Sequence, residues 1–208
     1  MPRRSVLLFG GLCLVVALVL AVTTLVVIGG RDSAATGSQP VTSTGQPSVG
    51  GPFTLVDQDG RSVDQTLLDG KWTLVFFGFT WCPDYCPTTL AALNATEAQL
   101  GDRADDLQVV FISVDPERDS PAVLKDYLSS DGFPEGVIGL TGTPYQVRVA
   151  ADAYRAYYKK VGEGEAYTMD HSLTVYLMGP DGKFRSALAG DLSPERSADV
   201  IRRAMDRS

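Results

Sequence analysis

The chain has 208 residues, a formal net charge of −7 and 44% hydrophobic residues. Three of its 18 basic residues precede Asp32, which leaves 15 basic against 25 acidic residues in the remainder. An acidic chain repels phosphate backbones, so we expect no nucleic-acid partner. The length allows one domain with its own hydrophobic core.

An uncharged run of 26 residues covers positions 5–30, directly after Arg3 and Arg4. As a helix it would span about 39 Å, which exceeds a hydrocarbon core of about 30 Å. The preceding arginines favour a cytoplasmic N-terminus. We predict that residues 1–30 form a cytoplasmic stub and an uncleaved transmembrane anchor, because a cleaved signal peptide usually has only about 7–15 apolar residues. Cys13 lies inside the run and is predicted to be inert.

Residues 31–52 are rich in serine, threonine, glycine and proline. This composition cannot form a core, so we predict a flexible linker with a root-mean-square reach of about 25 Å. Residues 53–208 are predicted to form a single domain on the far side of the membrane from the N-terminus.

The domain begins with alternating strand and helix patterns. Residues 53–64 predict two short strands around a DQDG turn, and residues 71–80 form a largely apolar run that suits a strand buried on both faces. Residues 88–101 predict a helix, because their leucines recur on one helical face. Residues 107–115 predict a second buried strand. This order indicates a βαβ unit.

The sequence of the second half of the domain predicts five further elements. They are a helix over residues 120–132, a strand over 137–142, a helix over 143–161, a β-hairpin over 171–190 and a terminal helix over 193–208. Ser120 and Ser193 each precede a proline and are predicted to cap their helices. A βαβ unit followed by a ββα unit predicts an α/β fold of the thioredoxin-like sandwich type.

Two cysteines, Cys82 and Cys86, lie between the first buried strand and its helix. Functional groups often occupy such a strand-to-helix junction, and a helix N-terminus lowers the pKa of a thiol. Pro87 implies that the helix begins near Cys86 or has an irregular first turn. Either arrangement keeps the two sulfurs close, so the pair can form a disulfide or hold one metal ion.

The number of other potential ligands in the domain indicates which metal ion the cysteine pair would hold. Zinc usually requires four ligands, whereas residues 53–208 contain two cysteines and one histidine, His171. Thiolates and imidazole suit Cu(I). His171 directly precedes a predicted buried strand, so we expect it to begin that strand at an end of the sheet. A structural disulfide between the cysteines remains the alternative interpretation.

Several motifs together resemble the Sco/SenC family. They are CPDYCP after an aromatic strand, SVDPERDSP at 113–121, and MDHSLTVYL at 169–177 followed by GPDGKF. The resemblance runs in order from about Phe53 to the C-terminus. It implies a thioredoxin-like copper-binding domain on the outer side of an energy-coupling membrane. We expect this to be a bacterial-type cytoplasmic membrane that the chain crosses once, with the domain in the periplasm or extracytoplasmic space. It also implies a role in assembling cytochrome c oxidase, at the CuA centre of subunit II.

Residue roles follow from the resemblance position by position. Cys82, Cys86 and His171 would be the copper ligands. Asp115, in the DPERD motif, would steady the loop that faces the metal. The resemblance leaves open whether Cu(I) or Cu(II) is held, and which upstream donor supplies the copper.

Two functions of different classes are compatible with these residues. The first is a metallochaperone that passes copper to an acceptor by ligand exchange. The second is a thiol–disulfide oxidoreductase that reduces the cysteine pair of the CuA-bearing subunit, with Cys82 attacking and Cys86 resolving. Trp81 before Cys82 is similar to thioredoxins, but the three-residue spacer is not. A peroxidase is disfavoured, because two neighbouring cysteines do not resemble the usual single-cysteine pocket.

Overall fold

The computed structural model of the chain describes residues 49–191 and 193–207. The predicted anchor over residues 1–30 lies outside the described residues, as does most of the predicted linker over 31–52. Among the helices that the structure describes, none has the length and apolar character needed to cross a membrane.

The domain is built on a seven-stranded mixed sheet with the strand order β2-β1-β5-β4-β3-β8-β9. Its strands are β1 (Thr54–Asp57), β2 (Ser62–Asp64), β3 (Trp72–Gly78), β4 (Leu107–Ser113), β5 (Ile138–Thr141), β8 (Thr174–Met178) and β9 (Phe184–Ala189). Strands β3, β4 and β5 are parallel, whereas β1, β2, β8 and β9 pair antiparallel with their neighbours. The two-stranded sheet β6 (Tyr158–Val161) and β7 (Thr168–His171) is separate.

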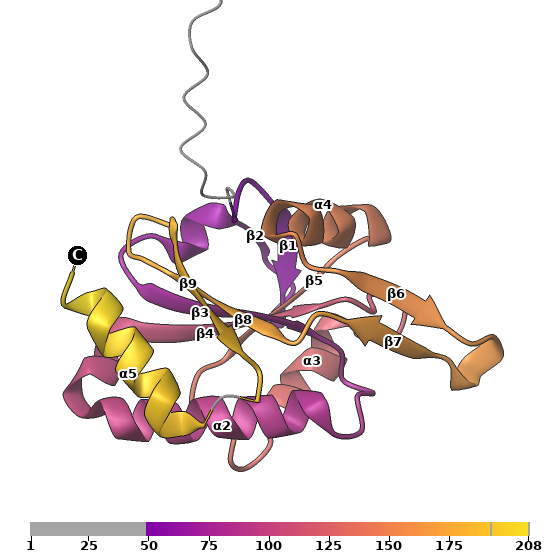
Figure 1. Ribbon diagram of the computed structural model, residues 1–208. Helices are drawn as coiled ribbons and strands as arrows, with labels where there is room; N and C mark the ends of the chain where they lie inside the picture. The colour runs from indigo at the N-terminus through magenta and orange to yellow at the C-terminus, as the bar shows by residue number, and fades with distance from the viewer. Residues whose placement is uncertain (1–48, 192, 208) are drawn as a thin grey trace, which may run out of the picture. The chain divides into compact units, whose positions relative to one another are not determined.

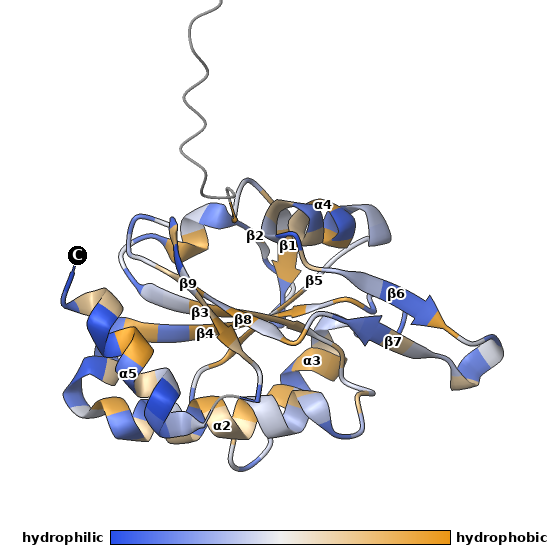
Figure 2. Cartoon of the chain, viewed as in Figure 1, coloured by the Kyte–Doolittle hydropathy of each residue, from blue (hydrophilic) through white to orange (hydrophobic). Residues whose placement is uncertain are grey.

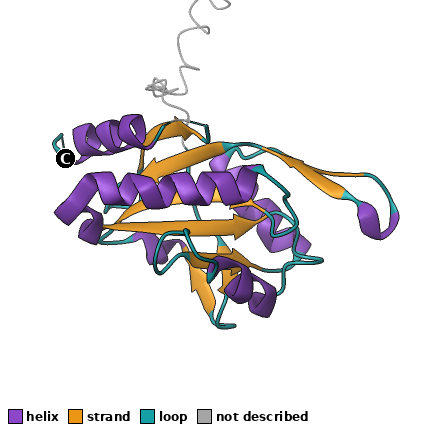
Figure 3. Cartoon of the chain, turned by 90° about the horizontal axis from the view of Figure 1, so that it is seen from below, coloured by secondary structure: helices purple, strands orange, loops and turns teal. Residues whose placement is uncertain are grey.

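Helices cover both faces of the large sheet. They are α2 (Tyr85–Leu100), α3 (Pro121–Leu128), α4 (Pro144–Tyr154) and α5 (Pro194–Met205), with short 3₁₀ turns at Gln65–Leu68, Gly101–Asp106 and Gly164–Ala166. Figures 1 and 3 show α2, α3 and α5 on one face and α4 on the other. The unit β3-α2-β4 and the unit β8-β9-α5 confirm the predicted α/β thioredoxin-like sandwich.

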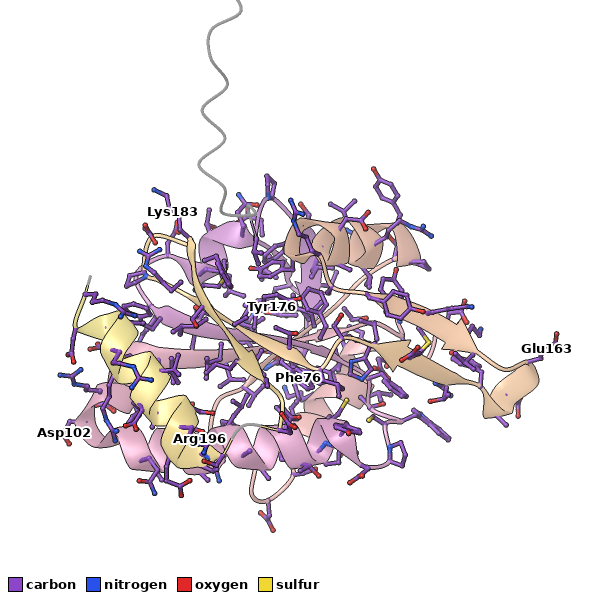
Figure 4. All side chains as sticks on the ribbon, viewed as in Figure 1. Phe76, Asp102, Glu163, Tyr176, Lys183 and Arg196 are labelled. Atoms are coloured by element: carbon purple, nitrogen blue, oxygen red, sulfur yellow. The ribbon has the colours of Figure 1, made fainter. Side chains whose placement is uncertain are left out.

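The core lies where the central strands meet the helices. Every residue of β3 is buried, as its apolar sequence predicts, and Phe76 packs edge-on against Phe111 of β4 with ring centroids 5.9 Å apart. Figure 2 shows the central strands as the most hydrophobic part of the fold, and Figure 4 places Phe76 and Tyr176 there. Each large apolar side chain buried in this way stabilises the fold by about 1.5–3 kcal/mol.

The helix starts follow the predicted capping residues. The Ser120 hydroxyl accepts from the backbone N–H of Val123, and the Ser193 hydroxyl accepts from that of Arg196. Helix α2 begins at Tyr85, next to Cys86 as the position of Pro87 predicted, and three residues before the helical pattern at 88–101. Pro87 is its third residue, and the first four N–H groups of a helix have no acceptor within it. A proline is therefore compatible with this turn.

The prediction of one helix over residues 143–161 was wrong at its C-terminal end. Helix α4 stops at Tyr154, Arg155 adopts a left-handed conformation (φ 55°), and residues 158–161 form strand β6. Strand β6 pairs with β7, and the two project from the large sheet as a hairpin (Figures 1 and 3) with Glu163 near its tip (Figure 4). The two strands lie close together in the chain, but the helix-like pattern of residues 143–161 gave no sign that the last four of these residues pair with β7.

The predicted hairpin over residues 171–190 is present as β8 and β9. His171, however, is the last residue of β7 and does not begin β8. The chain turns at Ser172, whose backbone N–H donates to the carbonyl of Tyr157. The histidine is therefore carried by the projecting hairpin of β6 and β7 rather than by the large sheet.

Candidate metal centre

The structure brings Cys82, Cys86 and His171 together. Their potential ligand atoms all lie within 4.8 Å of one another. The sulfur of Cys86 is 3.7 Å from Nε2 of His171, although the two residues are 85 positions apart. The backbone N–H of Cys86 donates to the sulfur of Cys82 at 3.3 Å. The two cysteines are free and are not joined by a disulfide.

The two cysteines differ in exposure because they occupy different local structures. Cys82 lies in the loop between β3 and α2 and is partly exposed, whereas Cys86 is the second residue of α2 and is fully buried. A glycine makes room for the buried sulfur. A Cβ atom on Gly78, at the end of β3, would lie only 2.8 Å from the Cys86 sulfur.

A shallow cavity gives access to this centre. It has a volume of about 270 Å³, and its lining includes Cys82, His171, Phe79 and Tyr85. Tyr85 and Trp81 are 51% and 66% exposed, which is unusual for large aromatic side chains. An approaching molecule therefore meets Cys82 and His171 first, and Cys86 lies behind them.

The imidazole of His171 is oriented by its surroundings. Its Nδ1 lies 3.0 Å from the backbone carbonyl of Ser172, and because a carbonyl only accepts, Nδ1 is the donor. The lone pair of Nε2 is then free to bind a metal. The ring of Phe79 packs perpendicular to the imidazole with centroids 5.7 Å apart, and Phe76 lies at 6.2 Å.

The pKa values of the two thiols are shifted in opposite directions. A hydrogen bond from Cys86 lowers the pKa of Cys82 to about 4, with further help from backbone N–H groups, although burial opposes the change. The same sulfur–sulfur hydrogen bond, burial and the negative charge of Cys82 raise the pKa of Cys86. At neutral pH the metal-free pair therefore consists of one thiolate and one thiol, and a metal ion must displace the remaining proton to bind both sulfurs.

The separations between the donor atoms suit a three-coordinate metal ion. With metal–sulfur bonds of about 2.3 Å and metal–nitrogen bonds of about 2.0–2.1 Å, a planar trigonal site requires a sulfur–nitrogen separation of about 3.8 Å and a sulfur–sulfur separation of about 4.0 Å. The 3.7 Å between Cys86 and His171 is close to the first value, and the 4.8 Å upper limit includes the second. Two thiolates and one imidazole are donors that suit Cu(I).

Asp115 is not one of the three potential metal ligands but belongs to a neighbouring cluster of side chains. Its carboxylate accepts from the Tyr167 hydroxyl at 2.7 Å and from Nε of Arg118. Arg118 also donates to the backbone carbonyl of Tyr167 at 3.0 Å, and its guanidinium lies 5.3 Å from the Trp81 ring centroid. We call Asp115, Arg118 and Tyr167 the clamp. It joins the loop after β4 to the residue before β7, the strand that carries His171.

Asp119 is a positioning residue that the sequence analysis missed. It is fully buried and accepts from the backbone N–H and the hydroxyl of Thr80 at 3.0 and 2.6 Å, and from the Ser113 hydroxyl at 2.6 Å. Thr80 precedes Cys82 by two residues, so Asp119 holds the start of the cysteine loop against β4. Its place in DPERD was the available signal, but the spacing alone does not distinguish it from a turn residue.

Both the sequence and the fold are similar to those of known proteins. A statistical model of the family described as SCO1/SenC matches residues 41–206. Protein SCO1 homolog 1, mitochondrial, of Arabidopsis thaliana is 43% identical over 144 residues, which are 68% of this chain and 42% of that protein. The chain spans about half the length of the mitochondrial relatives that head the comparison.

Similar chains with solved structures include one with copper bound and one described as apo. The structure of Bradyrhizobium japonicum ScoI with copper bound has 45% sequence identity and a TM-score of 0.67, and it covers 74% of this chain and 99% of that one. BsSco, a member of the Sco family of cytochrome c oxidase assembly proteins in which a disulfide switch was identified, has 31% identity and a TM-score of 0.62, covering 76% and 92%.

Proposed function

Because the chain belongs to the SCO1/SenC family, we propose that it is a membrane-anchored copper metallochaperone. It takes copper from an upstream donor and delivers it to the CuA centre in subunit II of cytochrome c oxidase. The observation that carries this proposal is the grouping of Cys82, Cys86 and His171, whose donor atoms lie within 4.8 Å of one another. The copper bound in a similar chain with 45% identity supports the choice of metal.

The unequal exposure of the three residues favours transfer by stepwise ligand exchange. Cys82 and His171 line the cavity, so incoming ligands of an acceptor reach their bonds to copper first. The buried sulfur of Cys86 exchanges last and keeps the ion bound until the acceptor holds it. Copper is cargo in this scheme, and its oxidation state need not change.

The N-terminal segment places the domain beside its membrane-bound acceptor. Residues 5–30 are long enough to cross the bilayer, with the arginines before them on the cytoplasmic side. The linker over residues 31–52 then allows the domain a reach of about 25 Å outside the cytoplasmic membrane.

X-ray absorption of the copper-loaded, reduced full chain tests the metal site. We expect one copper per chain, with two sulfur neighbours and one nitrogen neighbour. A stoichiometry well below one, or a site without sulfur, would refute the metallochaperone.

Replacing the histidine tests the three-ligand site more sharply. His171→Ala should cripple copper retention, because only two sulfurs remain, and should leave thiol exchange nearly intact. Thr168→Ala is a matched control, since it alters an exposed residue of the same strand, β7, and leaves the Nδ1 acceptor, the Ser172 backbone carbonyl, in place. Copper retention in His171→Ala equal to that of the wild type would show that the site does not use this residue.

The second candidate function is thiol–disulfide exchange. It is favoured by the different protonation states and exposures of the two cysteines. Cys82 is an accessible thiolate and Cys86 is a buried thiol. The Cys82 thiolate would attack the disulfide of the CuA-bearing subunit and form a mixed disulfide. Cys86, after losing its proton, would then attack the sulfur of Cys82. The acceptor leaves with two thiols, and this chain is left with a Cys82–Cys86 disulfide.

Two measurements test this second function. They are the rate at which the chain reduces that subunit's disulfide and the reduction potential of the Cys82–Cys86 pair. Fast reduction that Cys82→Ser abolishes would support it. Slow exchange by the wild-type chain would count against it and leave the metallochaperone unaffected.

A further inference from the structure

A groove with the opposite charge to the rest of the domain lies beside the metal centre. It has a volume of about 520 Å³ and is lined by the C-terminal part of α4, the turn after it and β6. Its exposed cations are Arg148, Arg155, Lys159 and Lys160, and its acidic residue is Asp152. From Asp32 onward, acidic residues outnumber basic ones by 25 to 15. We call this feature the basic groove.

Among the described residues, one of the four cations of the basic groove is held in an ion pair. Lys160 pairs with Glu117 at 2.6 Å. In the part of the chain that the structure describes, Arg148, Arg155 and Lys159 form no ion pair. Figure 2 shows β6 and much of α4 as hydrophilic. The groove is therefore available to a negatively charged partner.

The turn geometry does not explain the arginine at position 155. Arg155 is the one residue other than glycine with a positive φ among those described, and it ends α4 in the left-handed conformation. Glycine or asparagine is the usual residue at such a helix end, because other side chains are strained there. A long cation at this strained position points to a use for its charge.

The basic groove is directly linked to the residues that hold His171. Tyr157, which lines the groove, exchanges two hydrogen bonds with Ser172: its carbonyl accepts from the Ser172 N–H at 2.9 Å, and its N–H donates to the Ser172 hydroxyl at 2.8 Å. Tyr158, also in the lining, is the direct cross-strand partner of His171. A partner seated in the groove therefore lies next to the metal centre.

We propose that the basic groove docks an acidic segment of the protein that accepts copper from the metal centre. This inference rests on the proposed function. A lipid surface has anionic groups but cannot take copper from Cys82 and His171, whereas a copper acceptor must approach this edge of the domain. Tyr157 is 54% exposed, and tyrosine and arginine are enriched in protein–protein interfaces.

The test compares two charge-reversal variants of the full chain in phosphatidylcholine nanodiscs. The groove variant combines Arg148→Glu, Arg155→Glu and Lys159→Glu. The matched control combines Arg196→Glu, Arg203→Glu and Arg207→Glu, which changes the net charge equally at exposed positions on and after α5. The probes are the soluble CuA domain of subunit II and a fluorescent decaglutamate peptide.

We expect the groove variant to bind both probes at least about tenfold more weakly than the wild-type chain, with a shallower dependence on salt. The control should bind them as the wild type does. Equal losses in the two variants, or wild-type binding that does not respond to salt, would overturn the proposal. So would a wild-type chain that binds neither probe.

Two further measurements separate the causes of failure. Phosphatidylglycerol vesicles serve as a membrane probe, and loss of vesicle binding alone in the groove variant would overturn the proposal in favour of a lipid contact. Copper stoichiometry is measured on the same samples. A wild-type chain that binds the decaglutamate peptide but no copper would refute the proposed function, whereas normal copper loading with unaltered probe binding in the groove variant would refute only the docking inference.

Discussion

The guanidinium of Arg118 lies 3.6 Å from the centroid of the Tyr167 ring, and its Nη1 donates to the carbonyl of the same residue. Tyr167 directly precedes β7, which ends at His171. A two-stranded hairpin is marginally stable by itself, so its connection to Arg118 helps to fix the histidine relative to the cysteines. The clamp therefore positions His171, the proposed copper ligand, through the strand that carries it.

Breaking the clamp should weaken copper binding without removing a ligand. Arg118→Ala is expected to lower copper affinity by about 10–100-fold, as is typical when residues that orient metal ligands are lost. X-ray absorption should show a weaker nitrogen contribution and unchanged sulfur. Arg118→Lys should be intermediate, because an ammonium keeps the charge and loses the planar fork of donors.

Arg103→Ala is the control for this experiment, since Arg103 forms a largely exposed ion pair with Asp206 at the end of α5. Unchanged copper affinity in Arg118→Ala would mean that the hairpin holds its position without the clamp.

The acidity of Cys82 predicts how its reactivity depends on pH. Because its pKa is lowered to about 4, the thiolate is almost fully formed from about pH 5 upward. Alkylation of metal-free Cys82 by iodoacetamide should then be nearly independent of pH between 5 and 8. An ordinary cysteine, with a pKa near 8.5, reacts about tenfold faster for each pH unit over most of this range.

Cys86→Ser provides the comparison for this pH profile. A hydroxyl is a different donor from a thiol, and the hydrogen bond from Cys86 is the largest cause of the lowered pKa. The pH profile of Cys82 should therefore shift in this variant. Peptide mass spectrometry separates the label on Cys82 from any label on Cys13. A tenfold rise per pH unit in the wild-type chain would contradict the prediction.

Gly78 should not tolerate a side chain. A Cβ atom there would lie 2.7 Å from the Phe111 ring and 2.8 Å from the Cys86 sulfur. Gly78→Ala is expected to lower the free energy of unfolding by about 1–3 kcal/mol through overpacking, and to reduce copper affinity by displacing the sulfur. Thermal denaturation and copper titration measure the two effects. Gly51→Ala is the control, because its Cβ would make an ordinary 3.5 Å contact, and equal stability of the two variants would refute this account.

Removing Asp119 should loosen the cysteine loop. Asp119→Ala leaves the Thr80 N–H and hydroxyl and the Ser113 hydroxyl without their acceptor. We therefore expect the free energy of unfolding to fall by about 1–3 kcal/mol. Asp119→Asn should cost less, because it keeps one acceptor oxygen and removes the cost of burying a charge. Chemical denaturation at neutral pH gives both values. Asp131→Ala, at an exposed position, should have no effect, and a similar result for Asp119→Ala would show that these hydrogen bonds do not stabilise the loop.

Much of the fold could be predicted because its signals are local. The apolar runs at β3 and β4 indicate strands buried on both faces, and Ser120 and Ser193 cap the helices that follow them. Strand β6 could not be found in this way, because its residues follow α4 without a break in the helical pattern and only pairing with β7 makes them a strand.

The sequence by itself determined which donor atoms are available: two cysteines at a strand-to-helix junction and one histidine in the same domain. Only the tertiary structure decided that the histidine reaches them on a separate hairpin, that Cys86 is buried while Cys82 is accessible, and that Asp119 and the clamp hold these parts in place. The physical reason is distance along the chain. Residue type is read locally, whereas contacts between segments 39, 52 and 85 positions apart depend on how the whole sheet and its hairpin pack.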